Sequence, residues 1–371
     1  MENRHLLSEH TLDNVNYSLF LQQVSQVSKF KQVTIYAILS ISFLIPTNAN
    51  AIEITKQIHS PLNHPIGKQL NTRQPREEAD RLLRLGKQQY ASGTVDKTVE
   101  SGLQALEIYH SIGDLKAQGL TYDLLAGAYL QLGNLKDAED AIRRRLGIAR
   151  DNQDFQNQIF ALNNLGTLLL QKGEPKAAGQ TIQDALVIAR NLENIEGQGL
   201  SLSNLSLVNI RLGNYNQAIK LAETALIFRR QTGDVIGEIN TFNNLGDAYL
   251  MAGDYENTIS NYGTAMRLAR INFDRPSQLR AIDGLVTAHA AVSRYDRALE
   301  LLEQRLAIAK FLNNPREEFK YLVSSGELYE KIRDYGKARN FYQQALSLAR
   351  KLDDVKQEAK LLNILNELKG R

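Results

Sequence analysis

The chain contains no cysteine among its 371 residues. This absence excludes disulfide frameworks, thiolate zinc sites, iron–sulfur clusters, c-type haem attachment and a cysteine nucleophile. Proline is also scarce, with only 7 residues, whereas 43% of the residues are hydrophobic and 23% are charged. A chain of this composition is expected to fold and to favour helix, so disorder and a collagen-like structure are both excluded.

An excess of charge of one sign is also missing. Lys and Arg number 44 and Asp and Glu number 41, which gives a formal net charge of +3. So small an excess on so long a chain does not predict a nucleic-acid-binding surface. The sequence holds no His-Glu-x-x-His, no Gly-x-x-x-x-Gly-Lys and no Gly-x-Ser-x-Gly motif. We therefore expect a protein that is not an enzyme and that uses no cofactor and no metal.

One uncharged apolar run lies near the N-terminus, at residues 33–45. Lys29 and Lys31 precede it and Ala49-Asn50-Ala51 follows it, which is the order of a secretory signal peptide. We predict that residues 1–51 form this signal, that it is cleaved after Ala51, and that the protein is exported to a periplasm, the cell envelope or the medium. The run is shorter than the roughly 20 residues of a membrane-spanning helix, so no stable membrane insertion is expected after cleavage. The alternative is an uncleaved anchor that tethers the protein to the membrane.

The larger part of the chain repeats itself with a step of 40 residues. A Leu-Gly pair or a close variant of it recurs at Leu85-Gly86, Leu125-Ala126, Leu165-Gly166, Leu205-Ser206, Leu245-Gly246, Leu285-Val286 and Ser325-Gly326. Such a fixed period is typical of solenoids. It predicts seven units within residues 79–358, namely 79–118, 119–158, 159–198, 199–238, 239–278, 279–318 and 319–358.

Each unit is predicted to be a helical hairpin. In the fifth unit, Phe242, Leu245 and Tyr249 share one helix face, Gly253-Asp254 marks a turn, and a second apolar stripe runs over residues 259–269. Because neither helix can bury its stripe alone, neighbouring hairpins must stack into a continuous core. We therefore predict an all-α fold, a right-handed α-solenoid of seven tandem hairpins.

Two further segments flank the predicted repeats. Residues 52–78 contain Pro61, Pro65 and Pro75 among polar residues and are predicted to be an irregular linker. Residues 359–371 continue the apolar pattern after the seventh unit. We predict that they form a C-terminal capping helix, because the open edge of a solenoid needs a cover with a polar outer face.

The repeated residues also carry a resemblance to a known family. An aromatic residue follows the Leu by four positions at Tyr129, Tyr249 and Tyr329, and Gly-Asn/Asp-Tyr and Ala-Leu pairs come after it. This pattern resembles the tetratricopeptide repeat, in the variety of Pins-type G-protein-signalling modulators, kinesin light chains and many bacterial repeat proteins. The step of this chain is longer than the about 34 residues of the commonest form. The resemblance implies a scaffold that binds a protein or peptide partner in a concave groove lined by the first helices.

The resemblance also implies candidate binding residues on the first helices. In the resembled families, the Asn of Asn-Leu-Gly contacts bound peptide, and an amide can pair with both the N–H and the C=O of a peptide backbone. The matching residues, which we call the asparagine column, are Asn164, Asn204 and Asn244. With Leu165 buried, the opposite stripe of the helix is predicted to face the groove. It supplies the further candidates Asn163, Asn243, Asn240, Thr167, Arg211 and Asp247.

Each of these readings has an alternative. The asparagines could instead brace the neighbouring hairpin. A column of cations ends the predicted second helices, where it is expected to stabilise the helix C-termini, with a polyanion-binding ridge as the alternative; it consists of Arg150, Arg190, Arg230, Arg270, Lys310 and Arg350. For the whole chain, the alternative to a peptide-binding scaffold is a structural or self-associating solenoid that uses its edges and convex faces.

Overall fold

The computed structural model describes residues 73–368. The predicted signal peptide with its cleavage site at Ala51, and the first part of the predicted linker, lie outside the described residues. The described part consists of fifteen α-helices and contains no strand. None of these helices combines the length and apolarity that crossing a bilayer requires. The predicted all-α fold is confirmed.

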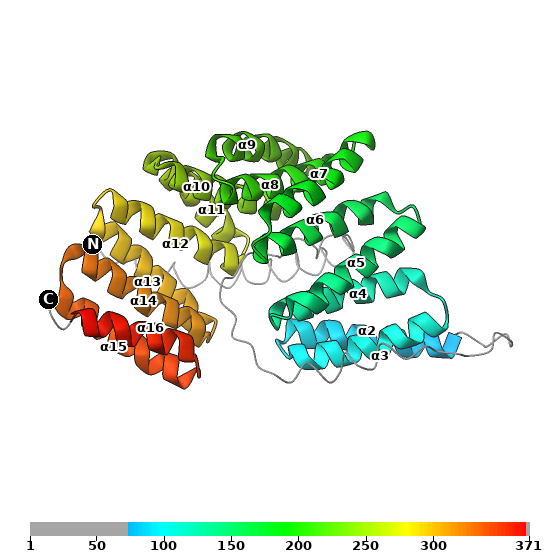
Figure 1. Ribbon diagram of the computed structural model, residues 1–371, viewed down its shortest axis with the longest axis horizontal. Coiled ribbons are helices and arrows are strands. Elements are labelled where there is room, and N and C mark those ends of the chain that lie inside the picture. Colours follow the sequence, from blue (N-terminus) through cyan, green and yellow to red (C-terminus); the bar gives the residue numbers. More distant parts are fainter. Residues whose placement is uncertain (1–72, 369–371) are drawn as a thin grey trace, which may run out of the picture. The chain divides into compact units, whose positions relative to one another are not determined.

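The helices pair into seven hairpins, and one more helix follows them (Figure 1). The first helices of the hairpins are α2 (Arg73–Ala91), α4 (Leu115–Gln131), α6 (Phe155–Gln171), α8 (Ile195–Arg211), α10 (Val235–Ala252), α12 (Arg275–Ala291) and α14 (Pro315–Ile332). The second helices are α3 (Val95–Ser111), α5 (Leu135–Asp151), α7 (Pro175–Asn191), α9 (Tyr215–Thr232), α11 (Tyr255–Ile271), α13 (Tyr295–Phe311) and α15 (Tyr335–Lys351), and α16 (Val355–Glu367) comes last. Each helix packs on the next along the chain, which makes the described part a helical solenoid.

The boundary predicted between linker and repeats is wrong. Helix α2 begins at Arg73, so the last residues of the predicted linker 52–78 are helical. Pro75 does not prevent this, because a proline in the first turn of a helix removes only an N–H that has no partner within the helix. The proline that favoured a linker is therefore compatible with a helix start.

Most helices begin at an Asp or Asn whose side chain caps the helix. The Asp234 carboxylate accepts a hydrogen bond from the Gly237 N–H at 2.8 Å, and the Asp354 carboxylate accepts one from the Gln357 N–H at 3.1 Å. Such a cap satisfies one of the free N–H groups of the first turn. Caps recur every 40 residues before the first helices, at Asp114, Asp154, Asn194, Asp234, Asp274, Asn314 and Asp354. First helices therefore start earlier than predicted, and α16 starts before the predicted capping segment 359–371.

Every connection between helices contains one residue in the left-handed backbone region. These residues follow one another at intervals of 20, at Gly93, Gly113, Gly133, Gln153, Gly173, Glu193, Gly213, Gly233, Gly253, Phe273, Ser293, Asn313, Arg333 and Asp353. A positive φ is strained for residues with a Cβ and free of that strain for glycine. The chain thus reverses at a fixed step with one backbone device, and half of the positions use glycine.

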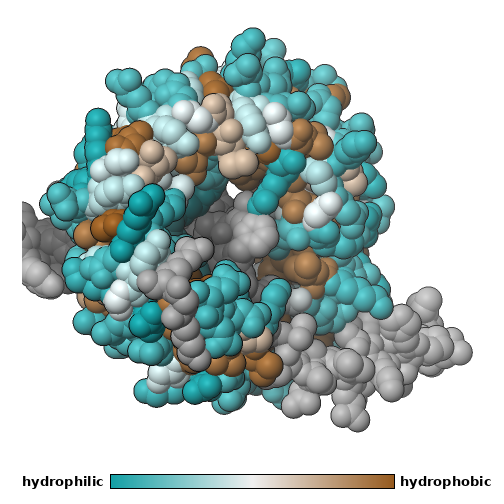
Figure 2. Space-filling model, turned by 60° about the vertical axis from the view of Figure 1, so that its left-hand side comes forward, coloured by the Kyte–Doolittle hydropathy of each residue, from teal (hydrophilic) through white to brown (hydrophobic). Residues whose placement is uncertain are grey.

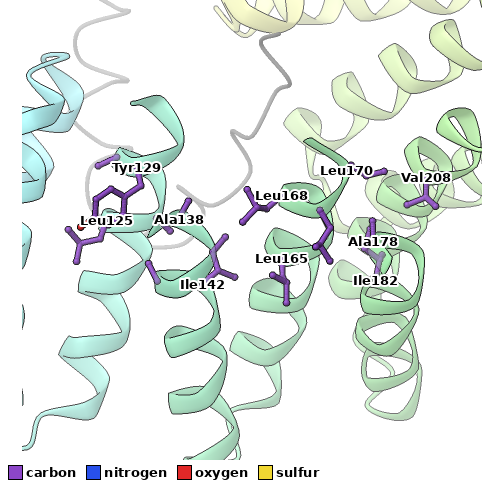
Figure 3. Packing of buried hydrophobic residues seen from close by; sticks show 14 of the residues in the cluster. Leu125, Tyr129, Ala138, Ile142, Leu165, Leu168, Leu170, Ala178, Ile182 and Val208 are labelled. Carbon is purple, nitrogen blue, oxygen red and sulfur yellow. The ribbon is translucent and has the colours of Figure 1, made fainter. Parts of the chain in front are cut away.

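The buried hydrophobic residues form clusters that extend across the hairpin boundaries. Figure 3 shows part of one cluster, in which Leu125 of α4, Ile142 of α5, Leu165 of α6 and Ile182 of α7 follow one another along the stack. The same cluster continues to Val208 of α8. Each hairpin therefore completes the core of its neighbours, as the sequence pattern predicts.

The two sets of helices differ in their neighbours. Consecutive first helices touch each other across the hairpins, α6 with α8, α8 with α10 and α10 with α12. No pair of consecutive second helices packs as closely in the described part of the chain. The first helices therefore form an inner layer, which we call the first-helix layer, and the candidate binding residues all belong to it.

Replacement of glycine by alanine is expected to have opposite effects on the free energy of unfolding at a left-handed position and inside a helix. Gly173 has a φ of +79°, and a Cβ added there would meet no atom within 4 Å. Gly173→Ala is therefore expected to lower the free energy of unfolding by about 1 kcal/mol through backbone strain alone. Gly147 lies inside α5 and is equally open, so Gly147→Ala is expected to raise it by about 1 kcal/mol.

Chemical denaturation monitored by circular dichroism measures both changes. Two shifts of the same sign would contradict this account of the connections.

Candidate functional site

Four of the nine residues predicted to face the groove are buried instead. On α6, Phe160, Asn164 and Gln171 are partly exposed, whereas Asn163 and Thr167 are buried. Asn243 and Asn244 of α10 are buried as well. The prediction that these four side chains line an open surface is wrong, because a first helix packs on its own hairpin and on the first helices to either side. Figure 2 shows one face of the molecule, where hydrophilic residues predominate and hydrophobic ones form separate patches.

Buried asparagines join α6 to α8. The Asn163 amide donates to Ser201 Oγ at 2.9 Å, and the Asn204 amide donates to Asn163 Oδ1 at 2.9 Å. Thr167 donates to the Asn163 carbonyl oxygen within α6 at 2.9 Å. Asn163 thus uses both its donor and its acceptor between two neighbouring hairpins.

The same arrangement joins α8 to α10 and α10 to α12. The Asn244 amide donates to the carbonyl and hydroxyl oxygens of Ser203, at 3.1 and 3.2 Å. The Asn243 amide donates to the Ser277 carbonyl oxygen at 3.2 Å, and the Ser277 hydroxyl donates to Asn240 Oδ1 at 3.2 Å. We call these contacts from α6 to α12 the polar seam. They match the alternative reading, in which the asparagines brace the next hairpin.

Asp247 is also engaged in contacts between repeats. It forms an ion pair with Arg280 and accepts a hydrogen bond from the Tyr262 hydroxyl. Arg280 in turn donates to Asn244 Oδ1 at 2.9 Å. Burial, together with the Asp247 charge, raises the pKa of Tyr262 well above its usual value. The tyrosine ring occupies the space where a Cβ at Gly284 would lie, which explains why the asparagine column ends there.

Two of the predicted binding residues stay at least partly on the surface. Asn164 is half-buried, and its side chain makes no hydrogen bond to any other described residue. Arg211, at the end of α8, is exposed. Peptide contact stays a prediction for these residues.

A cleft that the sequence did not predict opens toward the C-terminal end of the first-helix layer. It has a volume of about 340 Å³ and lies between α12, α14 and α16. Its apolar lining includes Val286, Ala290, Leu302, Phe319, Val323 and Leu328, and its charged lining consists of Asp283, Lys320, Glu327, Lys331 and Lys360. A sequence signal for it exists in the column of Phe160, which is apolar at Leu120, Phe160 and Leu200 and cationic at Arg280, Lys320 and Lys360.

The charges of the cleft do not cancel. Lys320 pairs with Glu317 at 2.9 Å and Asp283 pairs with Arg305 at 2.6 Å, whereas Lys331 and Lys360 lie within 4.0 Å of no described carboxylate. The carboxyl of Glu327 is removed from water, which raises its pKa. The positive charges of Lys360 and Lys331 act in the opposite direction, but their effect is smaller. Lys331 and Lys360 together with Glu327 therefore leave one net positive charge beside the cleft for an anionic group.

A fully buried arginine holds two walls of the cleft together. Arg305 of α13 donates to Asp283 of α12 at 2.6 Å and to the Glu317 carboxylate of α14 at 2.8 Å, and it also donates to the Glu317 carbonyl oxygen at 2.7 Å. Arg145 and Asp123 repeat the first of these contacts in the second hairpin, at 3.0 Å. Loss of one partner from a buried pair such as Arg305 and Glu317 is strongly destabilising, whereas Asp283 is partly exposed. The position of α14 beside α12 is thus fixed by charge as well as by packing.

The cationic column lies where predicted, in the last turn of the second helices. Arg230 and Arg350 bind Glu238 and Glu358, at 2.8 and 2.7 Å. The whole column is exposed, at Arg150, Arg190, Arg230, Arg270, Lys310 and Arg350. Neither its structural role nor polyanion binding is decided by these contacts.

Within residues 73–368, no group of three His, Asp or Glu side chains could hold a metal ion. His289 occupies the aromatic column and is buried, and this burial lowers its pKa.

Comparison with protein-family models agrees with the repeat pattern. Models described as tetratricopeptide repeat match residues 121–154, 158–231, 237–310 and 322–356. The chain belongs to the tetratricopeptide repeat family. Among curated protein sequences, none matches it significantly.

Several solved structures share the fold at low sequence identity. The apo form of RapI has a TM-score of 0.58 at 11% identity, over 75% of this chain and 99% of that one. A Rap protein complexed with Competence and Sporulation Factor has a TM-score of 0.53 at 13% identity, over 81% and 97%. A tetratricopeptide repeat protein from Parabacteroides merdae has a TM-score of 0.50 at 16% identity, over 77% and 98%. These similarities show the fold alone.

The polar seam predicts different effects for two members of the asparagine column. Asn244→Ala removes a buried amide that bonds Ser203 and Arg280, so the free energy of unfolding is expected to fall by about 1–3 kcal/mol. Asn164→Ala removes no hydrogen bond within the described residues and is expected to change it by less than about 0.5 kcal/mol.

Urea titration of both variants beside the unmodified protein makes the comparison. Equal losses of stability would contradict the assignment of Asn244 to the polar seam.

Proposed function

We propose that this tetratricopeptide repeat protein is a non-catalytic scaffold that binds a peptide segment of a partner protein on its first-helix layer. The cleft between α12, α14 and α16 is the main contact in this proposal. It carries the proposal because it combines an apolar lining with two unpaired lysines, whereas the central asparagines are mostly engaged in the polar seam.

The cleft favours a particular kind of segment. Its apolar lining can take one or two apolar side chains, since about 340 Å³ lies within the usual range of small ligand sites. Lys331 and Lys360 can pair with carboxylates beside them. A short segment with an apolar residue next to Asp, Glu or a C-terminal carboxylate fits both features.

The fold supports this proposal without deciding it. One structural neighbour is a Rap protein in complex with Competence and Sporulation Factor, so a similar arrangement of helices does hold a ligand in that protein. Tetratricopeptide scaffolds serve many unrelated partners, and the residues of each site decide its ligand. The central part of the layer, around Asn164, is a second place where the segment could extend.

We further propose that the protein is exported. This proposal depends on the apolar run at residues 33–45, the lysines before it and the Ala-Asn-Ala sequence after it. A membrane tether formed by the uncleaved run is the alternative.

The cleft proposal is tested with peptides selected from a random phage-displayed library on the full chain. The affinity of the selected peptides, measured by fluorescence anisotropy, is expected to fall about tenfold in a Lys331→Ala, Lys360→Ala double variant, because two rim ion pairs are lost. The matched control is Arg84→Ala with Lys87→Ala, which removes two exposed cations from α2 in the same layer.

Three outcomes of this experiment would contradict the proposal or part of it. A loss confined to the control, or equal in both variants, would refute the cleft as the site. A loss in Asn164→Ala alone would move the site to the centre of the layer, and failure to select any peptide would count against the scaffold function itself.

The export proposal is tested by the N-terminal sequence of the protein recovered from its source cells. We expect the mature chain to begin at Ile52, because a signal peptidase cuts after the second small residue of Ala-Asn-Ala. Mutation of Ala49 and Ala51 to Arg is expected to leave the precursor uncut. A cellular protein that retains residue 1 would contradict cleavage.

A further inference from the structure

Two neighbouring connections carry an exposed aromatic patch that breaks the pattern of the repeats. Phe273, between α11 and α12, is 67% exposed, and Phe311, at the end of α13, is 74% exposed. Ile271 lies beside them in sequence and is 59% exposed. We call Ile271, Phe273, Arg275 and Phe311 the aromatic patch.

The repeats provide an internal control for this patch. At the position of Ile271 and Phe311, the other hairpins have polar residues, namely Ser111, Asp151, Asn191, Gln231 and Lys351. At the position of Phe273 they have glycine or polar residues, namely Gly113, Gln153, Glu193, Gly233, Asn313 and Asp353. The fold therefore needs no apolar side chain at these places.

Phe273 also carries a cost that its neighbours avoid. Its φ of 57° lies in the left-handed region, which strains a bulky aromatic residue. Its ring contributes little to the core, because most of it faces solvent. Strain and exposed apolar surface together point to a function for the side chain.

Arg275 links the two rings. Its guanidinium carbon lies 6.0 Å from the centre of the Phe273 ring and 5.6 Å from the centre of the Phe311 ring. It also donates to Gln278 Oε1 at 2.8 Å. The corresponding position is apolar in the other hairpins, at Leu115, Phe155, Ile195, Val235, Pro315 and Val355. The cation between two phenylalanines is thus specific to this patch.

Positive charges outnumber negative ones around the aromatic patch, although Glu317 and Glu318 directly follow Arg316. Arg270, Lys310 and Arg316 are exposed on the same two segments, and Arg275 adds a fourth cation. Within residues 270–276 and 310–316, the only acidic residue is Asp274, whose carboxylate accepts the Ser277 N–H at 3.2 Å to cap α12. The patch is therefore both apolar and basic.

We propose that the aromatic patch is a peripheral contact with an anionic lipid bilayer. Apolar tips surrounded by Lys and Arg match the boundary between acyl chains and acidic headgroups. A bilayer accepts projecting side chains without a complementary pocket, whereas a folded partner needs one for each anchor. Contact at the patch leaves the cleft between α12, α14 and α16 to its peptide, so this inference is independent of the proposed function.

The absence of tryptophan from the chain allows a direct test on the full-length protein. The Phe311→Trp variant carries a single tryptophan in the patch, and the Phe155→Trp variant carries one at the first residue of α6, where Phe155 is 46% exposed. Both are mixed with vesicles of equimolar phosphatidylcholine and phosphatidylglycerol, and with vesicles of phosphatidylcholine alone. Lipids brominated on their acyl chains quench the fluorescence of a tryptophan that touches them. The signal therefore reports contact at the tryptophan itself, even if another part of the protein binds the vesicle.

The proposal predicts a blue shift and quenching for Phe311→Trp on the anionic vesicles, reduced by added salt because charges contribute. Phe155→Trp is expected to show neither. In Phe311→Trp combined with Phe273→Asn and Arg275→Gln, the vesicle affinity reported by the tryptophan is expected to fall at least about tenfold.

Unchanged circular dichroism shows that this triple variant is folded. No quenching of Phe311→Trp on anionic vesicles, or equal quenching of Phe155→Trp, would overturn the proposal.

Discussion

The structure depends on one backbone constraint, which is that the chain must reverse direction within three residues between all of its helices. A single left-handed residue in each connection achieves this, at intervals of 20 from Gly93 to Asp353. The fixed interval keeps every helix at nearly the same length and sets the register between neighbouring helices. Apolar stripes therefore meet in the same way in each hairpin, and the core can continue from one hairpin to the next.

Much of the fold could be predicted from the sequence, because repetition supplies many independent readings of one pattern. The step of 40, the two stripes of each hairpin and the family all followed from it. The helix starts do not follow from it, because the apolar stripes do not mark the capping residues such as Asp234 and Asp354, although these repeat with the same step. Pro75 likewise favours a break in the sequence pattern, whereas in the structure it lies in a first turn.

The orientation of the asparagines could not be predicted, and the reason is physical. A period of 3.6 residues separates one buried face from one exposed face, but a first helix of this fold packs on several sides. Asn163 and Asn244 are polar and still buried, because neighbouring hairpins provide their hydrogen-bond partners. Sequence alone does not distinguish an asparagine amide that is free to bind a ligand from one that hydrogen-bonds to the neighbouring hairpin.

Both candidate sites lie where the repeats differ from one another, and one of them involves the end of the solenoid. Helix α16, the last described helix, forms a wall of the cleft and packs on α15 and on Phe319 of α14. A helix at the edge of the described stack has fewer neighbours than an internal one and opens more readily. A ligand bound between α12, α14 and α16 would therefore stabilise the packing of α16 on the seventh hairpin. The free energy needed to detach α16 is expected to rise with the occupancy of the cleft.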